Sequence, residues 1–184
     1  LSASAPMYRY NQMPPILSTT ACTPLGMPMR ATARMTSQCG TSVKWSNAQP
    51  QLNAFLAKTN LPAYANGMGR GTVPRDSKHL FNRTRREALE AADVVVLAGT
   101  ILDFRMAFGQ SIPASAKIVQ LDMDNMLIGH NRASHAALVG NLAVSFDALM
   151  REMDTQKIAL DFSAYSAELR AKEDAHNAKE KAKQ

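Results

Sequence analysis

Acidic residues are missing from the first 75 positions of this 184-residue chain, although the whole sequence contains 15 Asp and Glu. The net charge of +6 therefore arises from an unusual N-terminal stretch. Farther along, basic and acidic residues alternate, as in Arg83-Thr-Arg-Arg-Glu87. A nucleic-acid interface gathers its basic residues in a patch or stripe. The charge pattern thus argues against a nucleic-acid partner.

Long apolar runs and cysteine pairs are also missing. No apolar stretch approaches the roughly 20 residues that a membrane-spanning helix needs, so no membrane association is expected. The two cysteines, Cys22 and Cys39, have no metal-ligand spacing and offer no support for a disulfide-built secreted fold. The length is suited to one domain with a single core and tails.

Residues 1–39 are rich in Ser, Thr, Met and Pro and have no sustained period of 2 or 3.6 residues. Three interpretations remain open: an organelle transit peptide, a non-native stretch, and a disordered tail. We therefore treat 1–39 as a disordered or non-native leader. A cytoplasmic location is expected, or an organelle if this leader is a transit peptide.

The central pattern is a pair of apolar runs, Val94–Ala98 and Lys117–Leu121, separated by too many residues for a hairpin. Unbroken β-branched runs are typical of strands that helices cover on both faces. The two runs therefore predict neighbouring parallel strands in an α/β sheet. In such sheets ligands lie beyond the carboxyl ends of the strands.

Weaker signals complete the expected fold around these two strands. We expect strands at 63–65 and 137–140, a helix capped by Ser46 that includes Leu52 and Phe55, and helices at 85–92 and 143–153. The glycine-rich loop at 66–74 allows close approach to a ligand, but a plain tight turn is the more common explanation of such a loop. Asp103 and Arg105 form either a surface ion pair or a polar pair at a ligand. The charged tail after Thr155 is expected to be a solvated helix or linker.

The order of these motifs resembles the central domain of thiamine-diphosphate-dependent enzymes. The matching series is Leu61-Pro-x-x-x-Asn-Gly-Met-Gly-Arg-Gly-x-x-Pro74, Ala92-Asp-Val-Val-Val-Leu-x-Gly-Thr100, Leu102-Asp-Phe-Arg105 and Lys117-Ile-Val-Gln-Leu-Asp-x-Asp124. It is similar to acetolactate synthase large subunits and to 2-hydroxyacyl-CoA lyases. The resemblance implies a Rossmann-like parallel sheet in a three-layer αβα arrangement. It covers residues 40–153, leaving 154–184 as a charged linker or helical tail.

The resemblance also implies which ligands and partners to expect. The parent enzymes use thiamine diphosphate and Mg²⁺, but the residues that bind these lie in domains not recognised in this chain. Some central domains of the family bind FAD or ADP. The corresponding cofactor-binding positions here are Gly40, Gly67, Met68, Gly69, Gly99, Thr100, Asp103, Arg105, Asp122 and Asp124. The expected partners are the remaining domains or subunits of such an enzyme, as a homo-oligomer.

Three departures from the family pattern stand out. An apolar strand normally precedes the glycine that corresponds to Gly40, whereas 33–39 is polar and looks unsuited to a central strand. Ile101 replaces an arginine that FAD-binding synthases often carry, and Asn141 replaces a commonly acidic residue. The first strand of the sheet is therefore in doubt.

The sequence thus predicts a truncated central domain of a thiamine-diphosphate- and Mg²⁺-dependent enzyme, itself without a catalytic residue. In the parent enzyme the reaction would be decarboxylation and carboligation of a 2-keto acid, or cleavage of a 2-hydroxyacyl compound. The alternatives are a stand-alone FAD- or ADP-binding module and a purely structural one. A sirtuin-like deacylase finds no support, since the four histidines lie in no catalytic motif and no Cys-x-x-Cys pair exists.

Overall fold

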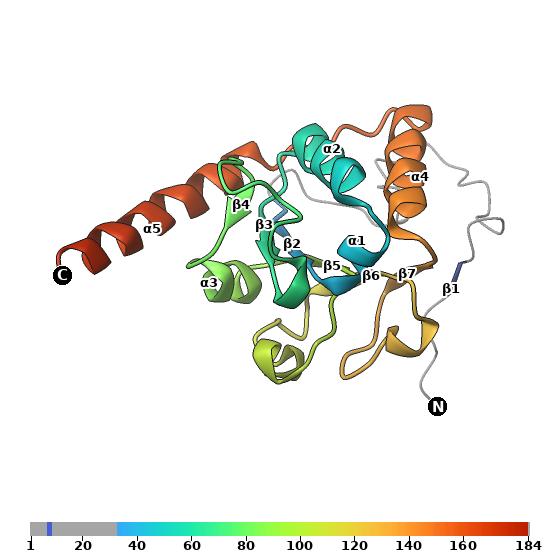
Figure 1. Ribbon diagram of the computed structural model, residues 1–184, viewed down its shortest axis with the longest axis horizontal. Coiled ribbons are helices and arrows are strands. Elements are labelled where there is room, and N and C mark those ends of the chain that lie inside the picture. The colour runs from blue at the N-terminus through green and yellow to red at the C-terminus, as the bar shows by residue number, and fades with distance from the viewer. Residues whose placement is uncertain (1–6, 9–32, 184) are drawn as a thin grey trace.

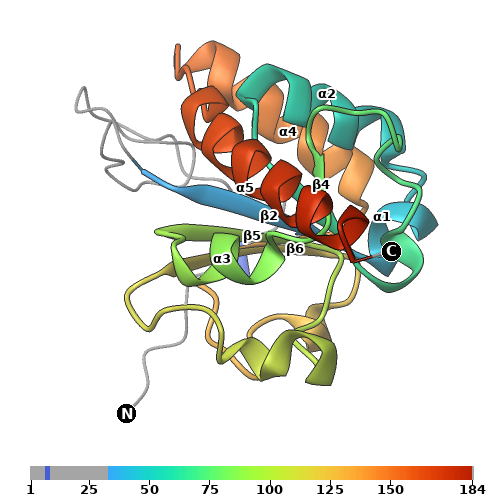
Figure 2. The ribbon, with the colours of Figure 1, turned by 90° about the vertical axis from the view of Figure 1, so that its left-hand side faces the viewer.

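The computed structural model describes residues 7–8 and 33–183, and nearly all of the predicted leader lies outside them. The described residues form a parallel sheet with helices on both faces (Figures 1 and 2). The strands are β1 (Met7–Tyr8), β2 (Met35–Cys39), β3 (Ala63–Ala65), β4 (Leu80–Phe81), β5 (Val94–Ala98), β6 (Lys117–Asp122) and β7 (Ala136–Val139). Their order across the sheet is β1-β7-β6-β5-β2-β3-β4.

The helices divide into two covering layers and one edge helix. They are α1 (Thr41–Trp45), α2 (Gln49–Thr59), η2 (Gly67–Gly69), α3 (Arg85–Glu90), η3 (Phe104–Gly109), η4 (Asn125–Leu127), α4 (Leu142–Thr155) and α5 (Ser163–Lys181). Helices α2 and α4 cover one face of the sheet, while α3 and η3 lie against the other (Figure 2). The predicted three-layer α/β fold is confirmed. None of the described helices has the length and apolar character to cross a membrane.

The two central apolar runs are neighbouring parallel strands, as predicted. Val96 of β5 lies opposite Val119 of β6 in the register. Alternate side chains enter two different cores: Val96 packs in the core under α2 and α4, whereas Val95 packs with Leu89 of α3 on the other side. Both faces are buried, which explains why β5 reads as a continuous apolar run.

The expectation that 33–39 is unsuited to a central strand was wrong. Strand β2 pairs with β5 on one side and with β3 on the other, and all five of its residues are buried. Ser37 tolerates this position because its hydroxyl donates to the Pro62 carbonyl at 3.2 Å. The hydrogen-bond ladders to two neighbours therefore outweigh the low strand propensity of the side chains.

The buried side chain of Gln38 lowers the stability of this polar strand. Its side chain is fully buried, and neither amide atom has a hydrogen-bond partner among the described residues. An unpaired buried polar group costs about 1–3 kcal/mol. We therefore expect Gln38→Met, which keeps the side-chain length and removes both polar atoms, to raise the free energy of unfolding by about 1 kcal/mol or more. Urea denaturation would measure the change, and a loss of stability would show that the amide is paired in solution.

The start of the first long helix also differs from the prediction. Ser46 follows α1 and does not cap α2, which begins at Gln49 with Ala48 before it and Pro50 in its first turn. The Ser46 hydroxyl instead accepts a hydrogen bond from the Leu142 backbone N–H at 3.1 Å. The serine thus stabilises the start of α4, at a sequence distance that local patterns do not reveal.

The charged tail forms α5, which lies along the β4 edge of the sheet (Figure 1). Tyr165 and Leu169 of α5 are buried in a small apolar cluster with Tyr64 and Phe81. Arg170 donates to the carbonyl oxygens of Lys78 and Leu80, both at 2.9 Å. Helix α5 therefore covers an edge strand that would otherwise expose unpaired backbone groups.

Candidate functional site

The strand order places a ligand crevice between β2 and β5. From β2 the chain passes to β3 and β4 on one side, then returns to β5, β6 and β7 on the other. In open α/β sheets, the carboxyl ends of the strands at such a reversal form the usual ligand site. Most of the predicted cofactor-binding residues lie in loops at this end of the sheet, and their geometry can be examined one group at a time.

Three of the predicted glycines, Gly40, Gly69 and Gly99, pack closely against other atoms of the chain. A Cβ atom added at Gly40 would lie 2.3 Å from the Gly99 carbonyl oxygen and 2.5 Å from the Thr100 Cβ atom. One added at Gly69 would lie 2.4 Å from the Cys39 carbonyl oxygen. Glycine is therefore required here because three loops interlock. At these positions the space for close approach is filled by protein atoms, which leaves no cradle for a diphosphate.

The loop before Gly69 carries the two other predicted residues, Gly67 and Met68. Gly67 adopts a φ of +53°, and a Cβ atom built there would be 3.4 Å from an Nη1 atom of Arg105. Met68 is 47% exposed. The structure thus brings the Gly67 loop and the Arg105 side chain together over the carboxyl end of the sheet.

Asp103 and Arg105 form an ion pair with 2.6 Å between Oδ2 and Nη2. The Arg105 side-chain hydrogen bond is the main reason that the pKa of Asp103 lies below its usual range. Asp103 also accepts the Arg105 backbone N–H at 2.9 Å at the start of η3. The two side chains therefore pair with each other next to the Gly67 loop.

The two aspartates after β6 have different environments. Asp122 is 1% exposed, and its Oδ1 atom accepts from the Ser42 hydroxyl at 3.0 Å and from the Asp124 N–H at 3.2 Å. Its Oδ2 atom is buried without a partner among the described residues. Asp124 is exposed and accepts the Met126 N–H at the start of η4. Ser42 was not predicted, although a hydroxyl two residues after the glycine at a strand end was a usable signal.

Neither a nucleophile nor a metal centre is evident among the described residues. Burial raises the pKa of the Cys39 thiol to about 12, so this cysteine is protonated within the core. In the described part of the chain no group of three or more His, Cys, Asp or Glu is placed to hold a metal ion. No step of thiamine chemistry is therefore assigned to the described residues.

Exposed apolar side chains gather at the same end of the sheet. Among the described residues, every large hydrophobic side chain that is exposed follows the carboxyl end of β2, β3, β5, β6 or β7. We call this set the apolar carboxyl-edge surface: Trp45, Met68, Ile101, Phe104, Phe108, Met123, Met126 and Val144. Phe104 and Met126 are the most exposed of the phenylalanines and methionines in it, at 73% and 78%.

Comparisons with known proteins agree with this architecture. Residues 30–149 match the family model described as the thiamine pyrophosphate enzyme central domain. The chain is 34% identical over 110 residues to an acetolactate synthase large subunit of Mycobacterium tuberculosis, which covers 60% of this chain and 20% of that protein. It is 38% identical over 74 residues to 2-hydroxyacyl-CoA lyase 2 of Bos taurus, covering 40% of this chain and 12% of the relative.

A solved structure shows the same fold at lower sequence identity. Benzoylformate decarboxylase of Polynucleobacter necessarius superposes with a TM-score of 0.54 at 17% identity, covering 66% of this chain and 24% of the other. The chain thus spans about a fifth of the acetolactate synthase and about a quarter of the decarboxylase. The family match includes β2 to β7 with the helices between them and ends within α4. The chain belongs to the thiamine pyrophosphate enzyme family and corresponds to the central domain of those enzymes.

Proposed function

We propose that this chain serves as a non-catalytic central domain of a thiamine-diphosphate- and Mg²⁺-dependent enzyme related to acetolactate synthase. The parent reaction would be decarboxylation and carboligation of a 2-keto acid, or cleavage of a 2-hydroxyacyl compound. The cofactor and metal would be held by other domains or subunits. The role of this chain is to pack against them through the apolar carboxyl-edge surface.

The apolar carboxyl-edge surface is the observation that carries the proposal. Single exposed apolar residues are common on protein surfaces. A group of eight that share one end of the sheet is different, because exposed apolar groups rimmed by polar residues mark protein interaction sites. The interlocked glycines give the loops beneath this surface a fixed backbone. A preformed apolar surface on rigid loops is suited to contact with a neighbouring domain.

Self-association through this surface is the first expected result. Without its partner domains, the 184-residue chain should form concentration-dependent dimers or larger species in sedimentation velocity. The double variant Phe104→Ser/Met126→Ser should shift this equilibrium toward the monomer, since both side chains are exposed and their loss leaves the core intact. A matched control, Lys44→Ala/Lys117→Ala, changes two exposed residues of another kind. A wild-type monomer at every concentration would contradict this role for the surface.

The chain alone should also be inactive. Incubated with pyruvate, thiamine diphosphate and Mg²⁺, it is expected to consume no pyruvate, because the described residues place no group of three or more His, Cys, Asp or Glu together to hold the metal. A coupled assay of pyruvate loss, with a complete acetolactate synthase as the positive control, would measure this. Turnover above the protein-free background would show that the chain carries catalytic residues of its own.

A nucleotide-binding module is the second candidate. Two observations favour it: the Arg105 guanidinium lies beside Gly67, and the Asp122 Oδ2 atom is buried without a partner in the described chain. The packing of Gly40, Gly69 and Gly99 against backbone atoms weighs against it. Calorimetric titration with ADP and with FAD separates the two candidates, because micromolar binding that Arg105→Ala removes would favour the nucleotide-binding role.

A further inference from the structure

A polar depression lies along the outer side of β4, away from the β2–β5 crevice. It has a volume of about 570 Å³ and is bounded by the loop before β4, the loop after it, and α5. Leu80 contributes the one apolar side chain of its lining. The lining residues are Arg75, Asp76, Ser77, Lys78, Leu80, Asn82, Arg83, Arg170, Glu173 and Asn177.

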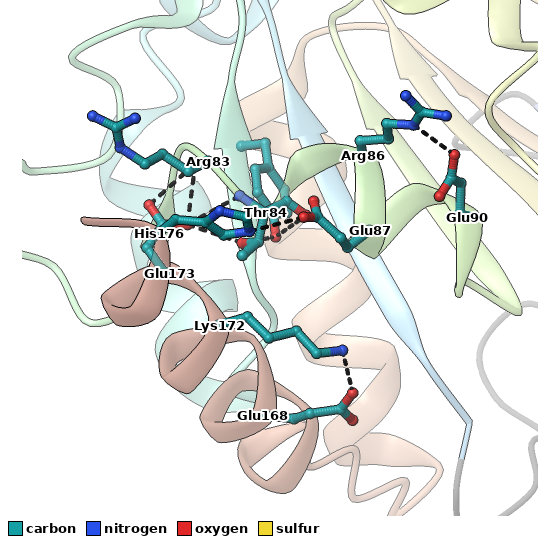
Figure 3. A network of polar contacts seen from close by, with 10 residues as sticks. Arg83, Thr84, Arg86, Glu87, Glu90, Glu168, Lys172, Glu173 and His176 are labelled. Atoms are coloured by element: carbon teal, nitrogen blue, oxygen red, sulfur yellow. Dashed lines mark hydrogen bonds and ion pairs between the residues drawn. The ribbon is translucent and has the colours of Figure 1, made fainter. Parts of the chain in front are cut away.

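Helix α5 fixes the walls of this depression from two positions. Arg170 holds the strand side through its bonds to the Lys78 and Leu80 carbonyls, and its guanidinium lies 4.0 Å from the Phe81 ring centroid. Glu173 holds the loop side by accepting backbone N–H groups from Asn82, Arg83 and Thr84. Figure 3 shows Glu173 with Arg83 and Thr84. The site is therefore built from ordered contacts that leave its shape defined before any ligand arrives.

The charges in the depression are not balanced. Its lining contains four cationic side chains and two carboxylates. The carboxylate of Glu173 is already occupied by three backbone N–H groups and the Thr84 hydroxyl. In the part of the chain that the structure describes, Arg75, Lys78 and Arg83 make no side-chain hydrogen bond or ion pair. Three cations without a hydrogen-bonded partner therefore line a concave space in which Asp76 is the exposed carboxylate. Outside this lining, Asp161 lies near enough to Lys78 for the ammonium to contribute to its lowered pKa.

We infer that this depression binds a small, multiply charged anion of the phosphate or diphosphate class. Arginine presents a planar fork of donors that matches phosphate oxygens, and lysine adds a point charge. The volume lies within the range of small-molecule sites, about 300–1,000 Å³. The amides of Asn82 and Asn177 supply neutral donors on two sides. The concave shape and the small number of cations are suited to a compact anion.

Titration of the whole 184-residue chain with pyrophosphate at low ionic strength tests the inference. Calorimetry should give one site per chain, with affinity that falls as salt screens the cations. The double variant Lys78→Ala/Arg83→Ala should bind at least about tenfold more weakly, since charge-assisted hydrogen bonds are lost. The control Lys44→Ala/Lys117→Ala removes the same charge from exposed positions elsewhere, and it should bind as the wild type does.

Three outcomes would overturn the inference. Pyrophosphate could give no heat and no chemical-shift change in the wild type. The Lys78→Ala/Arg83→Ala variant could bind as tightly as the wild type. The two double variants could lose affinity equally, which would indicate attraction by net charge and not a site. Circular dichroism of each variant shows whether the fold is retained, which is expected because all four residues are exposed.

Discussion

Gly99→Ala is expected to lower the free energy of unfolding by about 2–5 kcal/mol. Gly99 follows β5 with a φ of +61°, a region that costs an alanine about 1–2 kcal/mol. The new methyl group would also lie 2.6 Å from the Ser42 Cβ atom and 2.9 Å from the Val43 backbone nitrogen. Overpacking of this kind typically adds about 1–3 kcal/mol. Because α1 packs against η2, α2 and α4, and the Ser42 N–H donates to the Gly99 carbonyl, α1 cannot move away freely and both costs apply.

Gly71→Ala is the matched control for this prediction. Gly71 also has a positive φ, +88°, but a Cβ atom built there has no neighbour within 4 Å. Its substitution should lower the free energy of unfolding only by the cost of a positive φ for alanine, about 1–2 kcal/mol. The difference between the two variants in urea denaturation therefore isolates the steric overlap at the loop crossing. Equal losses would mean that α1 shifts freely and that the strand ends are not interlocked.

The same crossing shows how far the sequence predicts the candidate site. The glycine positions were predicted as places where a ligand approaches the backbone closely. The atoms that approach Gly40 and Gly99 are nevertheless backbone and Thr100 or Ser42 atoms of the chain. A glycine pattern states that space is needed next to the backbone, but it does not distinguish a ligand from another loop. The assignment of these residues to a cofactor thus stays a prediction.

The fold was predictable where burial leaves a local pattern. Both faces of β5 and β6 are covered, so their apolar runs identify the strands directly. Helix α3 was recognisable from its amphipathic spacing, and Arg86 and Glu90, four residues apart on its outer side, form an ion pair at 2.7 Å. These elements depend on residues within a few positions of one another, which a single sequence contains.

The unpredicted features depend on contacts between distant parts of the chain. Strand β2 is held by two neighbouring ladders, and its polar side chains gave no sign of this. Helix α5 looked like a solvated charged helix, yet Glu173 lies 4% exposed against the loop after β4, about 90 residues earlier in the sequence. A charge pattern in the sequence indicates which side chains are ionised. It does not indicate which of them accept hydrogen bonds from a backbone turn far away in the chain.

Glu173→Ala is accordingly expected to destabilise the chain by about 2–4 kcal/mol. The carboxylate accepts the N–H groups of Asn82, Arg83 and Thr84 at 2.9–3.1 Å, and the Thr84 hydroxyl at 2.9 Å. Loss of these bonds leaves several donors without an acceptor, and hydrogen bonds to charged groups contribute about 1.5–3 kcal/mol each. The estimate is below their sum because water reaches the exposed loop residues. Glu180→Gln, a change on the exposed part of the same helix, should have little effect.

The pH dependence of stability separates the contribution of the Glu173 charge from that of its side-chain shape. Burial works to raise the pKa of Glu173, but the donors from Asn82, Arg83 and Thr84 outweigh it, so the pKa lies below its ordinary value. A lowered folded-state pKa gives stability that is complete above the unfolded pKa of about 4.3 and is lost as pH falls through the folded pKa. Glu173→Gln cannot titrate, so its stability deficit relative to the wild type should shrink as the pH is lowered below about 4.

Denaturation of both proteins from pH 7 to pH 3 would measure this change. A deficit that stays constant over the range would show that Glu173 holds α5 by its shape alone. A shrinking deficit would show that an ionised carboxylate binds the loop after β4. Arg83 belongs to that loop and also lines the polar depression beside β4. The ionised Glu173 would then set the loop geometry on which this depression depends.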